Sequence, residues 1–299
     1  MLQTQLPYDI AICIPTRGRT VALATSIKSM INRASKPDRI QVIVAFDHDD
    51  YVGISYFNEK IKYWLEEKNV TYTVMITPRY GYIALNKYVN VMARAAEAEW
   101  IIFWNDDAIM DTDGWDREIA KYNGKFRILS FHAHNSHPYT IFPIVPHMWV
   151  RILGQVARHQ QTDHEVSHMA YLLDIFERIP VHVTHDRADL TGNNMDETYM
   201  NRPYASHDPN DPASIYHPSY SKARHNDLDQ LTAYMKHLGM DTSWWENVKS
   251  GKNEEPFIKL AMNDPNLQTV AGRQYAAKLK QQEEEQKAAT SKKKEKVKA

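Results

Sequence analysis

The alternation of short apolar runs with helical segments over residues 8–107 constrains the fold more than any other feature of the sequence. Three short apolar runs and one alternating segment rich in Thr and Val are predicted to be strands, and each of the first three strands precedes a segment that is predicted to be helical. The expected strands are 10–14, 40–46, 70–76 and 100–104, and the expected helices are 20–31, 51–67 and 83–98. This order predicts right-handed βαβ units and an α/β fold, with a Rossmann-like, mostly parallel central sheet flanked by helices.

The second half of the chain is less regular. We expect strands at 127–131, 140–144 and 181–184, helices at 166–176 and 228–238, and a long polar loop over 187–225. One domain is predicted over residues 1–267, with a donor half over about 8–120 and an acceptor or catalytic half over about 121–267. Residues 268–299 are predicted to form a charged, helical to disordered tail.

Composition excludes several classes of protein. The chain has 299 residues and a formal net charge of -1, so no global field directs it to nucleic acid or to a membrane. Cys13 is the only cysteine, which excludes an intrachain disulfide and favours a reducing, cytoplasmic location. The N-terminus does not resemble a secretory signal, and no window approaches 18 apolar residues, so no membrane span is expected.

Polar clusters follow three of the predicted strands. They are Thr16-Arg17, the acidic group from Asp47 to Asp50, and Asn105-Asp106-Asp107. In parallel sheets, ligands bind outside the carboxyl ends of the strands. Structural capping explains any one cluster, but three at one edge favour a binding site.

The third cluster has the chemistry of a metal site. Carboxylates that directly follow a buried strand are hard oxygen ligands, which suit Mg²⁺ or Mn²⁺ and bridge such an ion to diphosphate oxygens. The ion would neutralise charge on a departing nucleotide diphosphate. A strand-end turn is the alternative, because Asn and Asp favour turns.

Several motifs, in this order and spacing, resemble those of GT-A glycosyltransferases, most closely the large inverting family 2 and its phage-type members. Ile12-Cys-Ile-Pro15-Thr16-Arg17-Gly18-Arg19 is similar to the family's first strand and nucleotide loop, and Val44-Ala-Phe-Asp47-His-Asp49-Asp50 to its second-strand acidic cluster. Arg79-Tyr80-Gly81-Tyr82-Ile83-Ala84-Leu85-Asn86 and the following strand into Asn-Asp-Asp resemble its central signature. The resemblance is strong over about 8–120 and weaker to about 200, and it implies the GT-A, nucleotide-diphospho-sugar transferase fold.

The resemblance also implies roles for individual residues on the donor side. Thr16 and Arg17 would line the nucleotide pocket, and Asp47 or Asp49 would bind the base, which is often uracil. The remaining donor-side roles fall to Arg79 and Asn86 near the diphosphate or base, Asn105 at the ribose, Asp106 within the donor site, and Asp107 as the metal ligand. His185 would be the second metal ligand, with a hydrogen-bonded, partly buried histidine as the alternative.

On the acceptor side, Thr162-Asp163-His164-Glu165 begins a helical run and resembles the segment that carries the family's general base. Asp163 fits best, and Glu165 is the competitor; helix capping is the structural alternative for Asp163. Phe142-Pro143 and Leu153-Gly154 resemble the acceptor-side strand and loop. Asp196-Glu197-Thr198-Tyr199 resembles a flexible loop that closes over bound donor.

The sequence therefore predicts an enzyme that moves a sugar from a nucleotide diphosphate donor, a UDP-sugar, to an acceptor hydroxyl with inversion, using Mn²⁺ or Mg²⁺. The acceptor is a glycan or, as the specific alternative, a hydroxymethylated base in DNA. A nucleotidyltransferase ranks lower, because the loop after the first strand contains a single glycine. An inactive nucleotide-sugar-binding module is the remaining alternative.

Other conspicuous groups have structural interpretations. His132, His134 and His137 lack the cysteines or the helical spacing of a zinc site, so we interpret them as structural or as part of the acceptor cleft. Trp244-Trp245 is interpreted as packing or acceptor stacking. The lysine-rich C-terminus is interpreted as a solubilising tail, with polyanion binding as the alternative.

Overall fold

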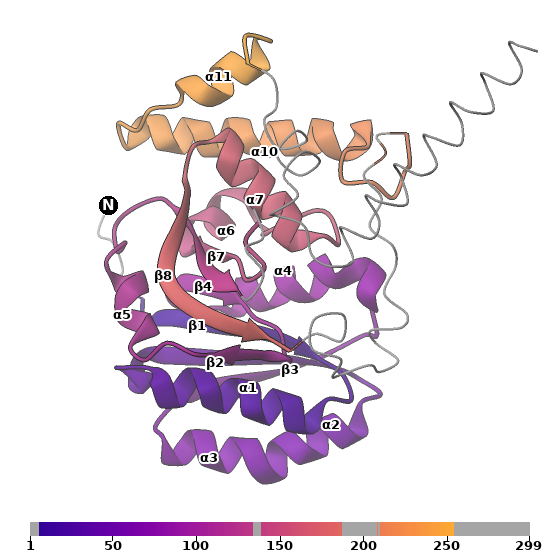
Figure 1. The fold of residues 1–299 in the computed structure, drawn as a ribbon. Helices are drawn as coiled ribbons and strands as arrows, with labels where there is room; N and C mark the ends of the chain where they lie inside the picture. The colour runs from indigo at the N-terminus through magenta and orange to yellow at the C-terminus, as the bar shows by residue number, and fades with distance from the viewer. Residues whose placement is uncertain (1–5, 134–138, 187–207, 209, 254–299) are drawn as a thin grey trace, which may run out of the picture.

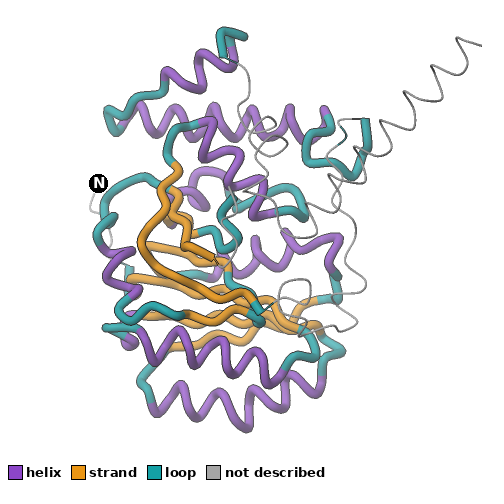
Figure 2. Tube along the Cα trace, in the orientation of Figure 1, coloured by secondary structure: helices purple, strands orange, loops and turns teal. Residues whose placement is uncertain are grey.

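A computed structural model describes residues 6–133, 139–186, 208 and 210–253. Over these residues the chain forms one sheet of eight strands in the order β3-β2-β1-β4-β7-β6-β8-β5, with helices on both sides (Figures 1 and 2). The mixed α/β architecture with a curled, mostly parallel sheet confirms the predicted fold class.

The first four strands are parallel and lie where the sequence predicts them. They are β1 (Tyr8–Thr16), β2 (Ile40–Asp47), β3 (Thr71–Thr77) and β4 (Ala98–Phe103). β1 lies between β2 and β4, and β3 pairs with the outer side of β2. The polar residues that follow β1, β2 and β4 therefore reach the same edge of the sheet.

The second half adds strands of mixed direction. They are β5 (Ala108–Met110), β6 (Ile128–Ala133), β7 (Ile144–Pro146) and β8 (Phe176–His185). β7 is antiparallel to β4 and β6, β8 is parallel to β6, and β5 is antiparallel to β8. β8 is longer than the strand predicted at 181–184, and β5 was not predicted.

The strand predicted at 140–144 is wrong in position, because β7 begins only at Ile144. Pro143 has no amide hydrogen to donate to a ladder, and its carbonyl accepts from the amide of Phe103 at 3.0 Å outside the regular pairing. The ring of Phe142 is buried in the core although the residue is not in a strand. Its apolar side chain gives the segment the composition of a strand.

The helices of the first half agree with the predicted segments. They are α1 (Thr20–Arg33), α2 (Tyr51–Tyr56), the π-helical turn η2 (Phe57–Ile61), α3 (Lys62–Glu67) and α4 (Leu85–Ala95), with short 3-10 turns η1 (Pro37–Arg39) and η3 (Tyr82–Ala84). The predicted helix 51–67 is thus continuous but contains a π-helical turn. The predicted helix 83–98 ends earlier, because β4 begins at Ala98.

The helices of the second half are α5 (Trp115–Ala120), α6 (His147–Leu153), α7 (Thr162–Leu172), α10 (Pro218–His237) and α11 (Ser243–Lys249). The prediction that α7 extends to residue 176 is wrong, since Asp174 has a φ of 54° and β8 starts two residues later. The predicted loop 187–225 is too long, because α10 starts at Pro218, a residue that suits the first turn of a helix. Residues 187–207 lie outside the described residues.

Two apolar cores cover the two faces of the sheet. Alternate residues of β1 show this: Ile10, Ile12 and Ile14 pack toward α1, η2 and α3, whereas Ala11 and Cys13 pack toward α4, α6 and α7. Figure 1 shows these helices on opposite sides of the strands. Burial on both faces explains why β1, β2 and β4 are continuous apolar runs rather than alternating ones.

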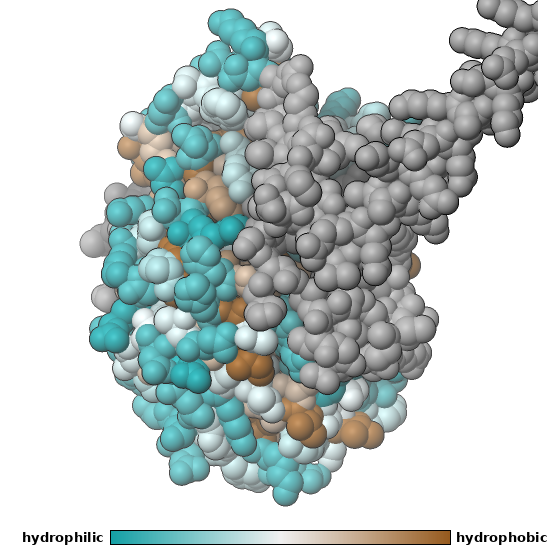
Figure 3. Space-filling view, in the orientation of Figure 1, coloured by the Kyte–Doolittle hydropathy of each residue, from teal (hydrophilic) through white to brown (hydrophobic). Residues whose placement is uncertain are grey.

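The helices α10 and α11 complete the second core. Leu228, Leu231 and Met235 of α10 and Trp245 of α11 are buried with the apolar residues of α6 and α7. Trp245 therefore packs in the core, which is the packing role predicted as one of two alternatives. Trp244 is 40% exposed. The coloured part of the face in Figure 3 is mainly hydrophilic, with scattered apolar groups. Within the described part of the chain, no helix combines the length and the apolar character that crossing a bilayer requires.

Candidate functional site

The three predicted polar clusters meet at the carboxyl edge of β1, β2 and β4. Thr16, at the end of β1, donates its hydroxyl hydrogen to Asp106 Oδ2 at 2.7 Å, which joins the first cluster to the third across 90 residues of sequence. Gly18 donates its amide to Asp50 Oδ2 at 2.9 Å, which joins the first cluster to the second. The expectation that the clusters share one edge is thus confirmed by direct contacts.

Gly18 divides the loop after β1 into two arms. Its φ of 69° lies in the left-handed region, which a glycine adopts without steric cost. On one side of this turn, Arg17 reaches the acidic cluster after β2. On the other side, Arg19 reaches the acidic pair after β4.

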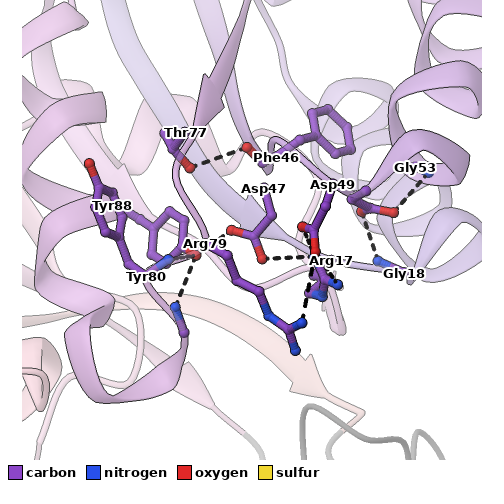
Figure 4. Close-up of polar contacts among 12 residues, drawn as sticks. Arg17, Gly18, Phe46, Asp47, Asp49, Gly53, Thr77, Arg79, Tyr80 and Tyr88 are labelled. Atoms are coloured by element: carbon purple, nitrogen blue, oxygen red, sulfur yellow. Dashed lines mark hydrogen bonds and ion pairs between the residues drawn. The ribbon is translucent and has the colours of Figure 1, made fainter.

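Arg17 is held by two carboxylates with different surroundings (Figure 4). Its Nη1 lies 2.5 Å from Asp49 Oδ1 and 3.1 Å from Asp47 Oδ2, and its Nη2 lies 3.1 Å from Asp49 Oδ2. The Asp49 side chain is 34% exposed, whereas that of Asp47 is 4% exposed. The hydrogen bond from Arg17 lowers the pKa of Asp49, so this partly exposed carboxylate is ionised.

Tyr88 of α4 connects Asp47 to the loop after β3. Its hydroxyl donates to Asp47 Oδ1 and accepts from the amides of Tyr80 at 2.9 Å and Gly81 at 3.2 Å (Figure 4). Burial, followed by the hydrogen bond to Asp47, raises the pKa of Tyr88 to about 12, so the hydroxyl keeps its proton. The tethered loop places Arg79 Nη1 3.8 Å from Asp49 Oδ2, on the same carboxylate as Arg17.

Arg19 bridges the buried acidic pair that follows β4. Its Nη1 lies 3.0 Å from Asp106 Oδ1 and 3.1 Å from Asp107 Oδ2. Burial raises the pKa of Asp106 to about 6, against the opposing charge of Arg19. Burial would also raise the pKa of Asp107, but the hydrogen bond and charge of His185 and the charge of Arg19 lower it instead.

His185 is brought to Asp107 by the pairing of β8 with β5. The register places His185 beside Ala108, and the amide of Asp186 donates to the carbonyl of Asp107 at 2.8 Å. His185 Nε2 then lies 3.1 Å from Asp107 Oδ1 and 3.2 Å from Asn105 Nδ2. The ring packs edge-on against Phe142, with centroids 5.2 Å apart, which fixes its orientation.

Asp107 and His185 fit a divalent ion. Two ligand atoms at right angles, each about 2.1 Å from an octahedral ion, are about 3.0 Å apart. The distance between His185 Nε2 and Asp107 Oδ1 is 3.1 Å. His185 Nε2 faces both a carboxylate acceptor and an amide donor, and it can form a hydrogen bond with only one of them. A cation would accept electron pairs from both the nitrogen and the carboxylate. Among the described residues, no group of three His, Cys, Asp or Glu side chains is arranged to hold a metal, so the other ligands of such an ion would be water or nucleotide oxygens.

The two candidate bases of α7 have different environments. Glu165 is 1% exposed, and its Oε2 accepts from the backbone amides of Arg158 at 2.8 Å and His159 at 2.7 Å. Burial raises the pKa of Glu165. Asp163 is half-buried in the first turn, and its Oδ1 accepts from the amide of His164 at 2.9 Å. Gln161, not Asp163, occupies the N-cap position of α7.

Asn86 is not part of the Arg17–Asp49 group. Its Nδ2 donates to the carbonyl of Arg158 at 2.7 Å, so the side chain joins α4 to the segment between α6 and α7. His132 stacks on His182 of β8, and the centroids of the two rings are 5.1 Å apart. The expected loop at 196–199, together with His134 and His137, lies outside the described residues.

The sequence-based prediction assigned no role to Arg19 or Tyr88. A signal for Arg19 is present in the sequence, because two arginines flank a glycine directly after the first strand, and two acidic clusters follow later strands. Tyr88 gives no such signal. It lies 41 residues from Asp47 in an ordinary helical segment, and only the packing of α4 against the sheet brings them together.

No protein-family model matches the chain, and no curated protein matches it. Solved structures do match, with 295 chains found. The mannosyltransferase PcManGT from Pyrobaculum calidifontis, in complex with GDP-Man and Mn²⁺, gives a TM-score of 0.50 at 13% identity, over 92% of this chain and 84% of its own. TarS 1–349 from S. aureus, in complex with UDP-GlcNAc, gives 0.50 at 13% identity, over 73% of this chain and 66% of its own.

A longer S. aureus TarS structure gives a TM-score of 0.46 at 14% identity, over 60% of this chain, which spans 37% of that protein's length. The class is defined by the fold: the chain is an α/β protein with a mixed sheet, and three polar clusters lie at one edge of that sheet. More particularly, it has the GT-A-like fold of the glycosyltransferases, as the resemblance in its motifs implies.

Proposed function

We propose that this protein is a metal-dependent glycosyltransferase that moves a sugar from a UDP-sugar to an acceptor hydroxyl. The observation that carries the proposal is the assembly of the three clusters at one edge of a GT-A-like sheet, with Asp107 Oδ1 3.1 Å from His185 Nε2. The fold supports it, since the neighbours with this fold were solved with GDP-Man and Mn²⁺ and with UDP-GlcNAc.

The arrangement around Asp49 supports a uracil base. The Watson–Crick edge of uracil presents an N–H donor between two carbonyl acceptors, so its complement is an acceptor between two donors. Asp49 supplies the acceptor, and Arg17 and Arg79 supply cationic donors at 2.5 Å and 3.8 Å from its oxygens. Asp47 is a less suitable residue for binding the base, because its side chain is 4% exposed, whereas that of Asp49 is 34% exposed.

Asp107 and His185 would hold the divalent ion, with Mn²⁺ favoured over Mg²⁺ because imidazole is one of the ligands. The bound ion would supply Lewis-acid stabilisation of the departing diphosphate. Asp106 would not bind the ion, because Thr16 and Arg19 already occupy its two oxygens. Asp106 instead joins the loop after β1 to the end of β4, and so keeps the donor site assembled.

On the acceptor side, Asp163 would act as the general base. It would accept the proton of the acceptor hydroxyl as that oxygen forms a bond to the anomeric carbon. The bond from the anomeric carbon to the diphosphate oxygen breaks in the same step, so UDP leaves and the configuration inverts. Asp163 is favoured over Glu165, because Glu165 is buried and holds two backbone amides.

Calorimetric titration with UDP, with and without Mn²⁺, tests the donor site. We expect Mn²⁺ to strengthen UDP binding to the wild type and to have no effect on Asp107→Ala. Asp113→Ala is the matched control, because Asp113 is an exposed carboxylate that pairs with Arg33 away from the site. GDP should bind more weakly than UDP, and equal binding of the two would contradict the assignment of the base.

Metal-dependent UDP binding would then justify a screen of UDP-sugars for hydrolysis and transfer. If UDP binds to neither protein under any metal condition, the proposed donor is wrong. If UDP binds equally well to Asp107→Ala with Mn²⁺ present, the donor assignment stands and the metal site is wrong.

A further inference from the structure

Arg19 contacts both carboxylates of the acidic pair with a single guanidinium nitrogen. Nη1 lies 3.0 Å from Asp106 Oδ1 and 3.1 Å from Asp107 Oδ2, and the three side chains are 13%, 8% and 6% exposed. Water therefore screens this group of charges weakly. A permanent positive charge lies directly beside the residue that would bind the divalent ion.

The two oxygens of Asp107 face different partners. Oδ2 faces Arg19, and Oδ1 faces His185 Nε2 at 3.1 Å. An ion bound at Oδ1 would share one carboxylate with the guanidinium and would be repelled by it. The formal charge of Asp106, Asp107 and Arg19 together is only -1, so the protein alone attracts a divalent ion weakly.

We propose that Arg19 is a resident cation of this site, which competes with the divalent ion for Asp107 in the nucleotide-free protein. In this role Arg19 offsets part of the charge of the two buried carboxylates and holds them together before the ion binds. The negative charge of a nucleotide diphosphate then compensates the added cation, so the ion enters with the nucleotide. This inference rests on the proposed function, because it assumes that the ion binds at Asp107 and His185.

A purely structural role for Arg19 predicts the opposite effect. If Arg19 only positioned Asp107, its removal would disorder the ligand and weaken ion binding. If Arg19 competes with the ion, its removal strengthens ion binding even though the loop after β1 loses a contact. The direction of the change in Mn²⁺ affinity therefore separates the two roles without any measurement of activity.

The test is titration of nucleotide-free protein with Mn²⁺ alone, with free Mn²⁺ followed by electron paramagnetic resonance. We expect Arg19→Gln to bind Mn²⁺ about tenfold more tightly than the wild type, which corresponds to about 1.4 kcal/mol. Arg19→Lys keeps the charge and should stay within about threefold of the wild type, well below a factor of ten. Arg33→Gln is the matched control, because it removes an exposed arginine from the other end of α1 and should leave the affinity unchanged.

Repeating the titration with saturating UDP tests the link to the nucleotide. UDP should strengthen Mn²⁺ binding more in the wild type than in Arg19→Gln, because the variant already lacks the competing charge. Unchanged or weaker Mn²⁺ binding by nucleotide-free Arg19→Gln would overturn the proposal, as would equal strengthening by UDP in both proteins. An increase in Arg19→Lys as large as that in Arg19→Gln would also overturn it.

Asp107→Asn separates this proposal from the proposed function. If Asp107→Asn binds Mn²⁺ like the wild type, the ion does not bind at Asp107 and the metal assignment itself fails. If Asp107→Asn loses Mn²⁺ binding while Arg19→Gln matches the wild type, only the role of Arg19 fails. Far-UV circular dichroism of each variant identifies misfolding, which can lower the measured affinity but cannot raise it.

Discussion

Single residues with the same chemistry take different roles at this site because their burial differs. Asp47 and Asp49 both follow β2, and the sequence predicts a nucleotide contact for one of them without deciding which. The side chain of Asp47 is 4% exposed and bound to Tyr88 of α4, whereas that of Asp49 is 34% exposed. No local pattern reveals this difference, because the partner of Asp47 lies 41 residues further along the chain.

The same argument distinguishes the two candidate bases. In Asp163→Asn we expect the transfer rate to fall by about 10²- to 10⁴-fold, the range that general bases contribute. In Glu165→Gln the amide oxygen can still accept from the amides of Arg158 and His159, so we expect a rate within about fivefold of the wild type, far from the loss of a base. Initial rates with a UDP-sugar at saturating acceptor measure both changes.

Glu165→Ala completes this comparison at the residue scale. It leaves two buried amides without their acceptor, which costs about 1–3 kcal/mol for each unsatisfied group. We therefore expect it to lower the free energy of unfolding, unlike Glu165→Gln. A large loss of rate in Glu165→Gln with normal stability would instead make Glu165 the base.

At the scale of the elements, side chains hold the backbone of the segment between α6 and α7, which forms no strand pairing. Asn90 of α4 accepts from the amide of Val156 at 2.7 Å and donates to the carbonyl of Ala157 at 2.8 Å, so its amide pairs like a strand residue. Glu165 and Asn86 hold the neighbouring residues of the segment. The sequence shows α4 as an amphipathic helix, but it does not show that polar residues on its buried side hold a distant loop.

Asn90→Ala tests how much this anchoring contributes. Asn90 is 8% exposed, and its loss leaves buried backbone groups of Val156 and Ala157 unpaired. We expect the free energy of unfolding in urea to fall by about 3 kcal/mol. Asn32→Ala, an exposed asparagine on α1, should change it by no more than about 0.5 kcal/mol. Equal effects of the two variants would contradict the anchoring role.

His159 makes the same segment sensitive to pH. Its Nδ1 accepts from the amide of Gln161 at 3.1 Å, so Nε2 carries the hydrogen and donates to the carbonyl of Ala213 at 3.0 Å. Burial, against the hydrogen bond to Ala213, lowers the pKa of His159 from 6.5. As the pH falls below about 6.5, the unfolded chain binds a proton that the folded protein excludes, so folding loses stability.

His159→Gln should remove this dependence on pH. Near pH 7.5 we expect the variant to be less stable than the wild type by about 1–2 kcal/mol, because it loses well-placed hydrogen bonds. The difference in stability between the two proteins should narrow as the pH falls toward 5.5. Only the wild type has the buried His159, which binds a proton more readily in the unfolded chain, so only the wild type loses stability in this way. Urea unfolding at several pH values measures the difference. The exposed His237→Gln is the control, and a difference for His159→Gln that stays constant with pH would contradict the role of His159.

The helices and strands were predicted best where the apolar residues of the sequence have a regular pattern. β1, β2 and β4 were predicted because strands buried on both faces give continuous apolar runs, whereas β3, at the edge of the sheet, was predicted from alternation and its Thr and Val residues. β5 and β7 contain three residues each and exist through pairing with distant partners, so no periodicity could reveal them. α10 was predicted ten residues too late because its first turns are polar and resemble the loop before it.

At the scale of the whole molecule, one sheet joins the predicted donor and acceptor halves. β4 of the first half pairs with β7 of the second, and β5 pairs with β8, which carries His185 to Asp107. The division of the chain at about residue 120 therefore does not coincide with a break in the hydrogen-bonded sheet. The proposed metal site depends on both halves, because Asp107 follows β4 and His185 ends β8.

A shared sheet predicts that the two halves unfold together. We expect differential scanning calorimetry to show one transition whose calorimetric and van't Hoff enthalpies agree, whereas separate domains would give two transitions or unequal enthalpies. Ligand at a hundredfold excess over its Kd stabilises the folded state by about 2.7 kcal/mol. With UDP and Mn²⁺ the whole transition should therefore move upward by about 4 °C or more without splitting. Asp107→Ala should lose the part of this shift that requires Mn²⁺, and Asp113→Ala should keep it. A transition that splits when UDP and Mn²⁺ are added would show that the ligands stabilise one half alone, and the shared sheet would then not couple the halves.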